Sequence, residues 1–124
     1  MRLLAAAVPM LFVASAVFAQ DTAALQNLAA CRAGAATVDL SFTYTGGGCE
    51  ETEPATVAIE GPVGKVTVPT RSTAEVCTMQ ATPIDVAQMI EAPAVTALEI
   101  ELLNPQGQVS ATGNVAVEPE CSQG

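Results

Sequence analysis

The sequence predicts a mainly β fold: a small antiparallel β-sandwich or small barrel, with one short N-terminal helix and stapled by disulfides. Three observations lead to this prediction. Apolar and polar residues alternate over several short segments, turn residues recur roughly every ten positions, and the chain carries four cysteines. Short alternating segments between regularly spaced turns are typical of sandwiches and small barrels.

Residues 1–19 predict a cleavable secretory signal peptide. Arg2 supplies a positive charge, an uncharged apolar run follows, and small residues precede Gln20, which is the arrangement of a secretory signal. The apolar run is shorter than the roughly 20 residues that a membrane-spanning helix needs. We therefore expect one mature domain over residues 20–124, without a transmembrane segment, in the periplasm or secreted to the medium.

The sequence Leu-Ala-Ala-Cys that ends at Cys31 leaves a second hypothesis open. Bacterial lipoproteins are cut and acylated at a cysteine in this pattern. Polar residues such as Asp21 and Asn27 separate Cys31 from the apolar run, and acylation would leave an odd number of cysteines in an oxidising compartment. The soluble exported form is therefore preferred over the lipoprotein.

Four cysteines, Cys31, Cys49, Cys77 and Cys121, predict two disulfides in an exported chain of this length. Pairing Cys31 with Cys49 is excluded, because the strand expected between them would span about 33 Å and bridged Cα atoms lie within about 7 Å. Two pairings stay open: 31–121 with 49–77, and 31–77 with 49–121. We favour the first, because it ties both ends of the mature chain to the domain.

The net charge limits the class of partner. Without Arg2, the mature chain has three basic residues, Arg32, Lys65 and Arg71, against 13 acidic ones, a net charge of −10. Binding of nucleic acid is excluded, because its affinity depends on cations that contact phosphates. An anionic membrane surface is disfavoured for the same reason. A protein partner is compatible with this charge, and it would be basic if electrostatic attraction drives the association.

The N-terminal helix is expected over residues 21–33. Asp21 can cap its first turn, and its alanines favour the helical state. Gly34 can end the helix in the left-handed conformation. A helix this short must dock on the rest of the domain.

The clearest strand is predicted at residues 36–45. Apolar and polar residues alternate there without exception, so Phe42 and Tyr44 are expected on the buried face. Three glycines, residues 46–48, are expected to end the strand. Weaker patterns predict strands at 55–60, around Val66 and Val68, at 73–82 and at 84–90, bounded by Gly61-Pro62, Pro69 and Pro83, because proline is disfavoured inside central strands.

A hairpin is predicted at the C-terminal end of the domain. Leu98, Ile100 and Leu102 alternate with glutamates, and Asn104-Pro105-Gln106-Gly107 is typical of a type I turn. Val109, Val115 and Val117 are expected to continue the apolar face on the returning strand.

The residue types exclude several kinds of catalysis. The chain has no histidine, which removes Ser-His-Asp and Cys-His nucleophiles and histidine metal sites. It has no Cys-x-x-Cys, so neither a thioredoxin-type centre nor a zinc ribbon is supported. Met79 and Met89 are expected in the core rather than as copper(I) ligands. We predict no catalytic site, cofactor or metal; an enzyme that uses carboxylates alone is a minor alternative.

The candidate interaction site is an acidic loop formed by Glu50, Glu51 and Glu53 beside Cys49. It lacks the spacing of a calcium loop and is expected to be solvated. Arg71 is expected to cap a neighbour rather than to bind a ligand carboxylate. The preferred function is a non-enzymatic binding or interaction module with an unidentified ligand. The alternative is a small inhibitor whose acidic loop enters the cleft of a basic enzyme, since a disulfide-anchored loop loses little entropy on binding.

Overall fold

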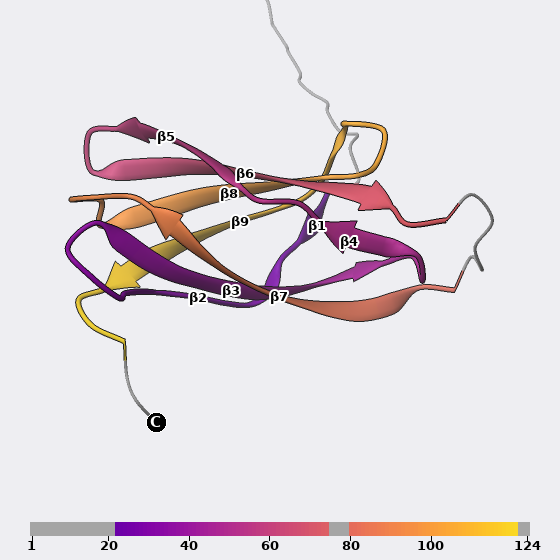
Figure 1. Cartoon of the computed structure of the whole chain (residues 1–124), viewed down its shortest axis with the longest axis horizontal. Helices are drawn as coiled ribbons and strands as arrows, with labels where there is room; N and C mark the ends of the chain where they lie inside the picture. The colour runs from indigo at the N-terminus through magenta and orange to yellow at the C-terminus, as the bar shows by residue number, and fades with distance from the viewer. Residues whose placement is uncertain (1–21, 75–79, 122–124) are drawn as a thin grey trace, which may run out of the picture.

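The computed structural model describes residues 22–74 and 80–121, which form nine strands and no helix. The strands are β1 (Ala23–Ala24), β2 (Gln26–Arg32), β3 (Thr37–Gly46), β4 (Glu50–Thr52), β5 (Thr56–Glu60), β6 (Val63–Ser72), β7 (Thr82–Glu91), β8 (Ala97–Leu103) and β9 (Val109–Glu118). Their order is β4-β6-β8-β9-β2-β3-β7, with β1 against β9 and β5 against β6 (Figure 1). The mainly β class is therefore confirmed.

The strands form two layers that are joined into a nearly closed, barrel-like sheet. In Figure 1, β5, β6 and β8 lie in the upper layer and β2 and β3 in the lower one. Strand β9 pairs with β8 and also with β2, and so connects the layers. The expected antiparallel arrangement is only partly correct, because β6/β8, β2/β9 and β1/β9 are parallel. The chain between β6 and β8 passes through β7 in the other layer, which is the kind of long crossover that a parallel pair requires.

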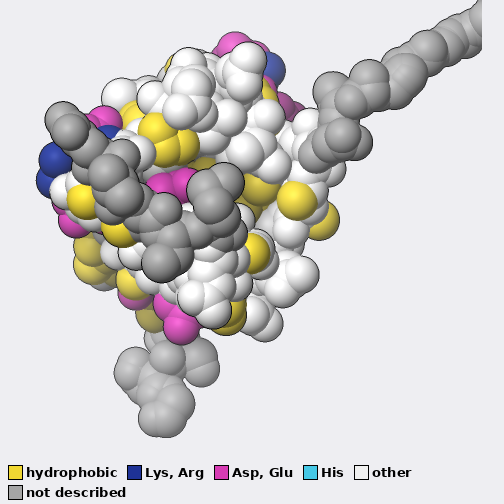
Figure 2. Space-filling model, turned by 90° about the vertical axis from the view of Figure 1, so that its right-hand side faces the viewer, with side chains coloured by type: hydrophobic (Ala, Val, Ile, Leu, Met, Phe, Trp, Pro, Cys, Tyr) yellow, Lys and Arg dark blue, Asp and Glu magenta, His cyan; other side chains and the backbone are white. Residues whose placement is uncertain are grey.

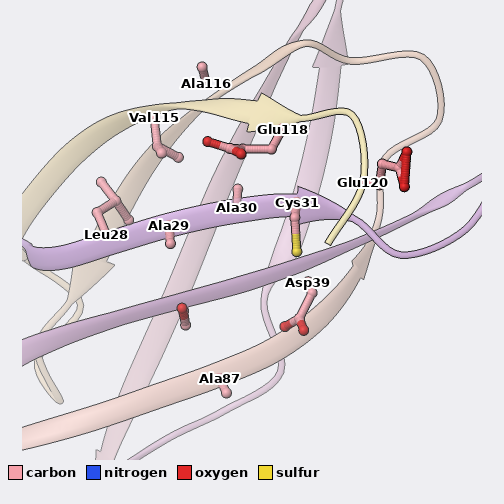
Figure 3. A pocket seen from close by; sticks show the side chains of 11 residues that line it. Leu28, Ala29, Ala30, Cys31, Asp39, Ala87, Val115, Ala116, Glu118 and Glu120 are labelled. Carbon is pink, nitrogen blue, oxygen red and sulfur yellow. The ribbon is translucent and has the colours of Figure 1, made fainter. Parts of the chain in front are cut away.

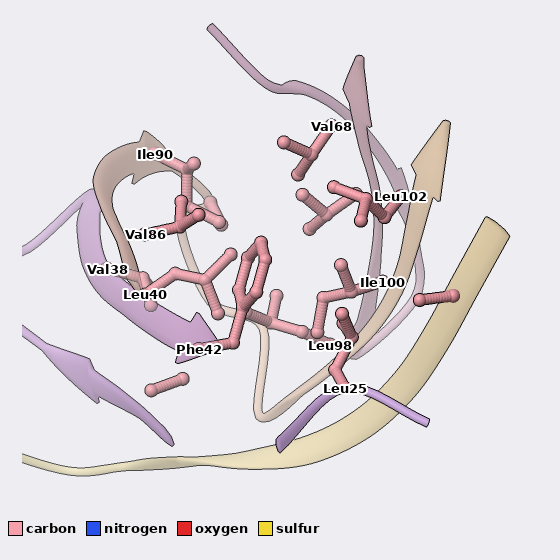
Figure 4. Packing of buried hydrophobic residues seen from close by; sticks show 14 of the residues in the cluster. Leu25, Val38, Leu40, Phe42, Val68, Val86, Ile90, Leu98, Ile100 and Leu102 are labelled. Atoms are coloured by element: carbon pink, nitrogen blue, oxygen red, sulfur yellow. The ribbon is translucent and has the colours of Figure 1, made fainter. Parts of the chain in front are cut away.

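Strand β3 has the alternation that the sequence predicts. Every second side chain from Val38 to Tyr44 is buried, and Phe42 is only 2% exposed. Figure 4 shows the Phe42 ring between the layers, near Leu40 on its own strand and Leu98 and Ile100 from β8. The same buried cluster contains Leu25, Ala30, Val66, Val68, Val86, Ile90, Ala92, Val95, Leu102 and Ala111.

The predicted N-terminal helix is wrong, because residues 23–32 form β1 and β2. Strand β2 pairs with β3 on one side and with β9 on the other. The helical preference of alanine is a few tenths of a kcal/mol per residue, and pairing on both sides outweighs it. Gly34 belongs to the turn into β3, where its N–H donates to the Thr37 carbonyl, and it does not take a positive φ. Asp21, the predicted cap, and the predicted signal at 1–19 lie outside the described residues.

The sequence predicts that Pro69 and Pro83 bound strands, but each lies inside a strand. Strand β6 continues through Pro69, because β5 pairs with β6 as far as Thr67 and β4 begins at Thr70. Pro69, which has no N–H, therefore lies between the part of β6 that pairs with β5 and the part that pairs with β4. Strand β7 is the last strand in the sheet order, and among the described residues its strand partner is β3 alone. Pro83 therefore lies in an edge strand, a position that tolerates proline. The strand expected at 73–82 is absent from its described residues before Thr82.

The turns predicted at Gly61-Pro62 and at Asn104–Gly107 are found. Gly61 and Gly107 take positive φ values of 63° and 85° at the β5–β6 and β8–β9 connections. The Gly107 N–H donates to the Asn104 carbonyl at 2.8 Å, as in a four-residue β-turn. On the returning strand, Val115 and Val117 pack against the core, but Val109 is 41% exposed. The expectation for Val109 is wrong because it lies next to the turn, where the pairing of β8 with β9 shifts register.

The favoured disulfide Cys31–Cys121 is confirmed, with a Cα–Cα distance of 4.8 Å. The Cys31 sulfur that the lipoprotein hypothesis would acylate is thus bonded to Cys121. Cys49 is also disulfide-bonded. Its predicted partner, Cys77, lies outside the described residues, so the 49–77 pairing stays a prediction.

One side chain bridges the seam between β7 and the segment that connects β4 to β5. Gln88 is on the inward side of β7, where a core residue would be expected. Its Oε1 accepts from the Ala55 N–H at 2.9 Å, and its Nε2 donates to the Glu53 carbonyl at 3.1 Å. The amide thus replaces the backbone pairing that a closed barrel would have here.

Replacing Gln88 by methionine should lower the free energy of unfolding by about 1–3 kcal/mol, because it leaves the Ala55 N–H and the Glu53 carbonyl without partners. Urea unfolding measures the change. Gln106→Met, at an exposed turn position whose side chain makes no hydrogen bond among the described residues, is the control and should change stability by less than about 0.5 kcal/mol. Equal effects would mean that the amide bridge does not hold the seam.

Candidate functional site

The predicted acidic loop is a strand whose charges are largely paired. Glu50–Thr52 form β4 and pair with β6. Arg71 on β6 forms an ion pair with Glu51 and another with Glu53 at 3.8 Å. The expectation of a loop is therefore wrong, because pairing with β6 makes it a strand and brings Arg71 opposite the acidic residues. The side chains of Glu51 and Glu53 are still about half exposed to solvent. Arg71 binds neighbouring carboxylates of its own chain, in line with its expected capping role.

The third residue of this cluster, Glu50, faces Tyr44. The Tyr44 hydroxyl lies 3.4 Å from the Glu50 Oε1, to which it donates a hydrogen bond. Burial, and then the Glu50 carboxylate, raise the pKa of Tyr44 to about 12. The hydroxyl therefore stays protonated near neutral pH and is no general base there.

The other two basic residues are also engaged within the protein. Lys65 lies 3.7 Å from both Glu60 and Glu99. The Arg32 guanidinium donates to the carbonyls of Ala92 and Val95 at 3.0 and 2.9 Å, and so fixes the connection between β7 and β8. Figure 2 shows, on one end of the molecule, Lys and Arg side chains beside Asp and Glu side chains.

A groove of about 460 Å³ runs along β2. Strand β9 borders it on one side, and β3 and β7 on the other. Figure 3 shows Cys31 and Ala29 on β2, Asp39 on β3, Ala87 on β7 and Glu118 on β9 around it. A smaller hollow between β3 and β7, lined by Asn27, Thr43 and Asp85 among others, shares Ser41 and Ala87 with the groove.

An irregularity in β2 opens the groove. The pairing of β2 with β3 shifts between Gln26 and Ala29, and Asn27 has a φ of 53°. Strand β2 therefore reaches β9 only at Ala30 and Cys31. Leu28 packs instead against Gly113, where an added Cβ would lie 2.6 Å from the Leu28 side chain. A larger residue at 113 would push β2 and β9 further apart.

Carboxylates gather on this side of the sheet. Cys31 lies in register between Asp39 and Glu118, and Glu120 lines the same groove. Asp85 and Glu91 are exposed on β7 beside them. We call this surface, defined by Asp39, Asp85, Glu91, Glu118 and Glu120, the acidic face. No lysine or arginine lines either hollow in the described residues.

Among the described residues, one group of side chains has the spacing of a possible metal site. Side-chain ligand atoms of Cys31, Asp39 and Cys121 lie within 4.8 Å of one another, but both sulfurs are used in the disulfide. Asp39 and Glu118 are on opposite neighbours of β2, so their backbones are about 10 Å apart.

The acidic face is the surface that sequence reasoning missed. Its members come from β3, β7, β9 and the segment after β9, so no local pattern brings them together. Met89 is on the same side of β7 and is 62% exposed, so the expectation of a core methionine is wrong for it. It occupies an outward position of the β7 alternation. Met79 lies outside the described residues.

Comparison of the chain with protein-family models, with curated proteins and with solved structures finds no match. In the described part of the chain, no helix is long and apolar enough to cross a membrane. The function must therefore be argued from the acidic face itself.

Proposed function

We propose that the protein is an exported, non-enzymatic interaction module whose acidic face binds a basic segment of a partner protein. One observation carries the proposal. Arg32, Lys65 and Arg71 all bind groups elsewhere in the domain, whereas no carboxylate of the acidic face forms an ion pair within the described residues.

The electrostatics favour a cationic partner. Asp39, Glu118 and Glu120 lie around one groove, so a cation placed there is attracted by several carboxylates at once. The net charge of −10 in the mature chain adds a long-range attraction that speeds encounter with a basic protein. Apolar atoms of Leu28 and Val115 in the groove, and Met89 beside it, offer contact to aliphatic side chains.

The composition supports a module without catalysis. The chain has no histidine, and the Tyr44 hydroxyl is held protonated by burial and Glu50. Export is proposed from the predicted signal at residues 1–19 and is supported by the Cys31–Cys121 disulfide, since disulfides persist in oxidising compartments.

The inhibitor alternative is less well supported than binding of a basic segment at the acidic face. It requires Glu50, Glu51 and Glu53 to meet cations of an enzyme. Arg71 already pairs with two of these carboxylates, and the third accepts the Tyr44 hydrogen bond. A partner would have to displace both contacts.

A labelled peptide of alternating lysine and valine tests the proposal. We expect it to bind the full mature protein, with an affinity that falls as salt is added. Replacing both Asp39 and Asp85 by asparagine should weaken binding roughly 2- to 30-fold, because each exposed ion pair contributes about 0.2–1 kcal/mol. Fluorescence anisotropy measures both effects.

A control pair of variants removes the same charge elsewhere. Glu60→Gln with Glu101→Gln leaves the acidic face intact, and Lys65 keeps its contact with Glu99. This pair should change the affinity less than about twofold. Equal weakening by the two pairs would show that only the total charge matters, and the acidic face would then not be the binding site.

A further inference from the structure

The outer edge of β7 carries unpaired backbone groups. Strand β7 pairs with β3 in unbroken register from Glu91 opposite Thr37 to Thr82 opposite Gly46. Its other side has no strand partner within residues 22–74 and 80–121. Within the same residues, the Gln88 side chain forms the hydrogen bonds between β7 and the segment from β4 to β5, and it does so from the inward side, where β5 also comes close to β7.

The hydrogen-bond pattern between β3 and β7 identifies the residues whose backbone groups point to the outer edge of β7. The Ala92 N–H donates to the Ala36 carbonyl at 2.9 Å, one position beyond the last pair of the register. Residues alternate between bonded and non-bonded pairs in an antiparallel ladder. Even-numbered residues of β7 therefore bond to β3, and Asp85, Ala87, Met89 and Glu91 direct their N–H and C=O groups to the outer edge.

The side chains on these odd-numbered residues are exposed and include two of the carboxylates of the acidic face. The inward residues Ile84, Val86 and Ile90 continue the core. A strand added at this edge would therefore have one face on the same side as the β7 carboxylates and the other face on the same side as the apolar core residues of β7. Pro83, at the start of the same edge, directs no N–H outward and limits the addition to the residues after it.

We propose that the basic partner binds by adding a β-strand to the outer edge of β7, with cationic side chains on the acidic face and apolar side chains turned inward. This inference rests on the proposed function and names the form in which the basic segment is bound. Main-chain hydrogen bonds would supply affinity, and the alternation of side chains would supply specificity.

Charge distinguishes this partner from a second copy of the chain. Two β7 edges side by side would bring Asp85 and Glu91 of one copy close to acidic residues of the other. Like charges on neighbouring strands destabilise pairing and are a common protection of exposed edges. The same carboxylates attract a basic strand.

Backbone methylation of the lysine-valine peptide tests the hydrogen bonds without altering its charge. Two versions are compared, one N-methylated at every lysine and the other at every valine. In an added strand the two residue types direct their N–H groups to opposite sides, so only one version loses its bonds to β7. We expect that version to bind at least about tenfold more weakly than the other. The loss falls on the lysine version for antiparallel addition and on the valine version for parallel addition.

A protein variant tests the same contact from the other side. Ala87→Pro removes one outward N–H and leaves the bonds of β7 to β3 in place, whereas Ala87→Ser keeps the N–H. The proline variant should lose about tenfold or more in affinity and the serine variant less than about twofold. Circular dichroism checks that each variant is folded, and the peptide comparison decides the question if the proline variant is not.

The outcomes separate the two proposals. Equal binding of the two methylated peptides, with the charge dependence intact, would overturn strand addition and leave the acidic face as the site. No binding of the unmodified peptide would overturn the proposed function. A dimer of the protein alone in sedimentation, lost in Ala87→Pro, would assign the edge to a second copy and overturn the inference.

Discussion

Replacing Phe42 by alanine should lower the free energy of unfolding by about 3–5 kcal/mol, the usual range for a large aromatic removed from a core. The ring is 2% exposed and lies between the two layers, with Leu98 and Ile100 opposite it. Its neighbours belong to paired strands of both layers, which limits how far they can collapse into the space left behind. Equilibrium unfolding in urea measures the loss.

The neighbouring residue provides the control. Thr43 points outward, where its hydroxyl donates to Asp85 at 2.7 Å and accepts from the Asn27 side chain at 3.2 Å. Both contacts are exposed to water, so Thr43→Ala should change stability by less than about 1 kcal/mol. Similar losses for the two variants would contradict the alternation of β3.

Replacing both Cys31 and Cys121 by alanine should lower the free energy of unfolding by about 2–5 kcal/mol. The two residues are 90 positions apart, so the bond closes a long loop and strongly restricts the unfolded chain. It also holds the end of β2 beside the end of β9, which pair directly only at Ala30 and Cys31.

Urea unfolding of the double variant without reducing agent measures this contribution, because the disulfide bond of Cys49 then stays intact. A shift of the midpoint to lower urea is the expected result. A loss below about 1 kcal/mol would mean that the strand pairing holds the two ends together without the cross-link.

The sequence correctly predicts the strands that are specified by nearby residues in the chain. Strand β3 and the β8–β9 hairpin depend on alternation and on turn residues, and both are found as expected. The N-terminal segment is not predicted correctly because its alanines favour a helix by only a few tenths of a kcal/mol per residue. Pairing with β3 and with the distant strand β9 outweighs this preference. Pro69 misleads for a similar reason: whether a proline interrupts a strand depends on where its partners begin and end.

The site was harder to predict than the fold. Glu50, Glu51 and Glu53 form the densest acidic cluster in the sequence, but Arg71, 20 residues after Glu51, lies opposite them in the folded sheet. Asp39, Asp85 and Glu118 are isolated in the sequence and come together only through the strand order β9-β2-β3-β7. The charges that are close along the chain are therefore bound within the domain by Arg71 and Tyr44. The carboxylates that have no ion pair among the described residues come together only in the folded sheet.

The place of β9 in the sheet has a consequence for the order of folding. It is the last strand in the described part of the chain, yet it occupies the middle of the order β4-β6-β8-β9-β2-β3-β7. Strands β6 and β8 on one side, and β2, β3 and β7 on the other, can pair early, but they become one sheet only when β9 is available. Folding is therefore completed only once β9 has been made, and it requires contacts of large sequence separation, which slow it. Until β9 joins the sheet, the strands on its two sides stay as two separate, incompletely folded parts.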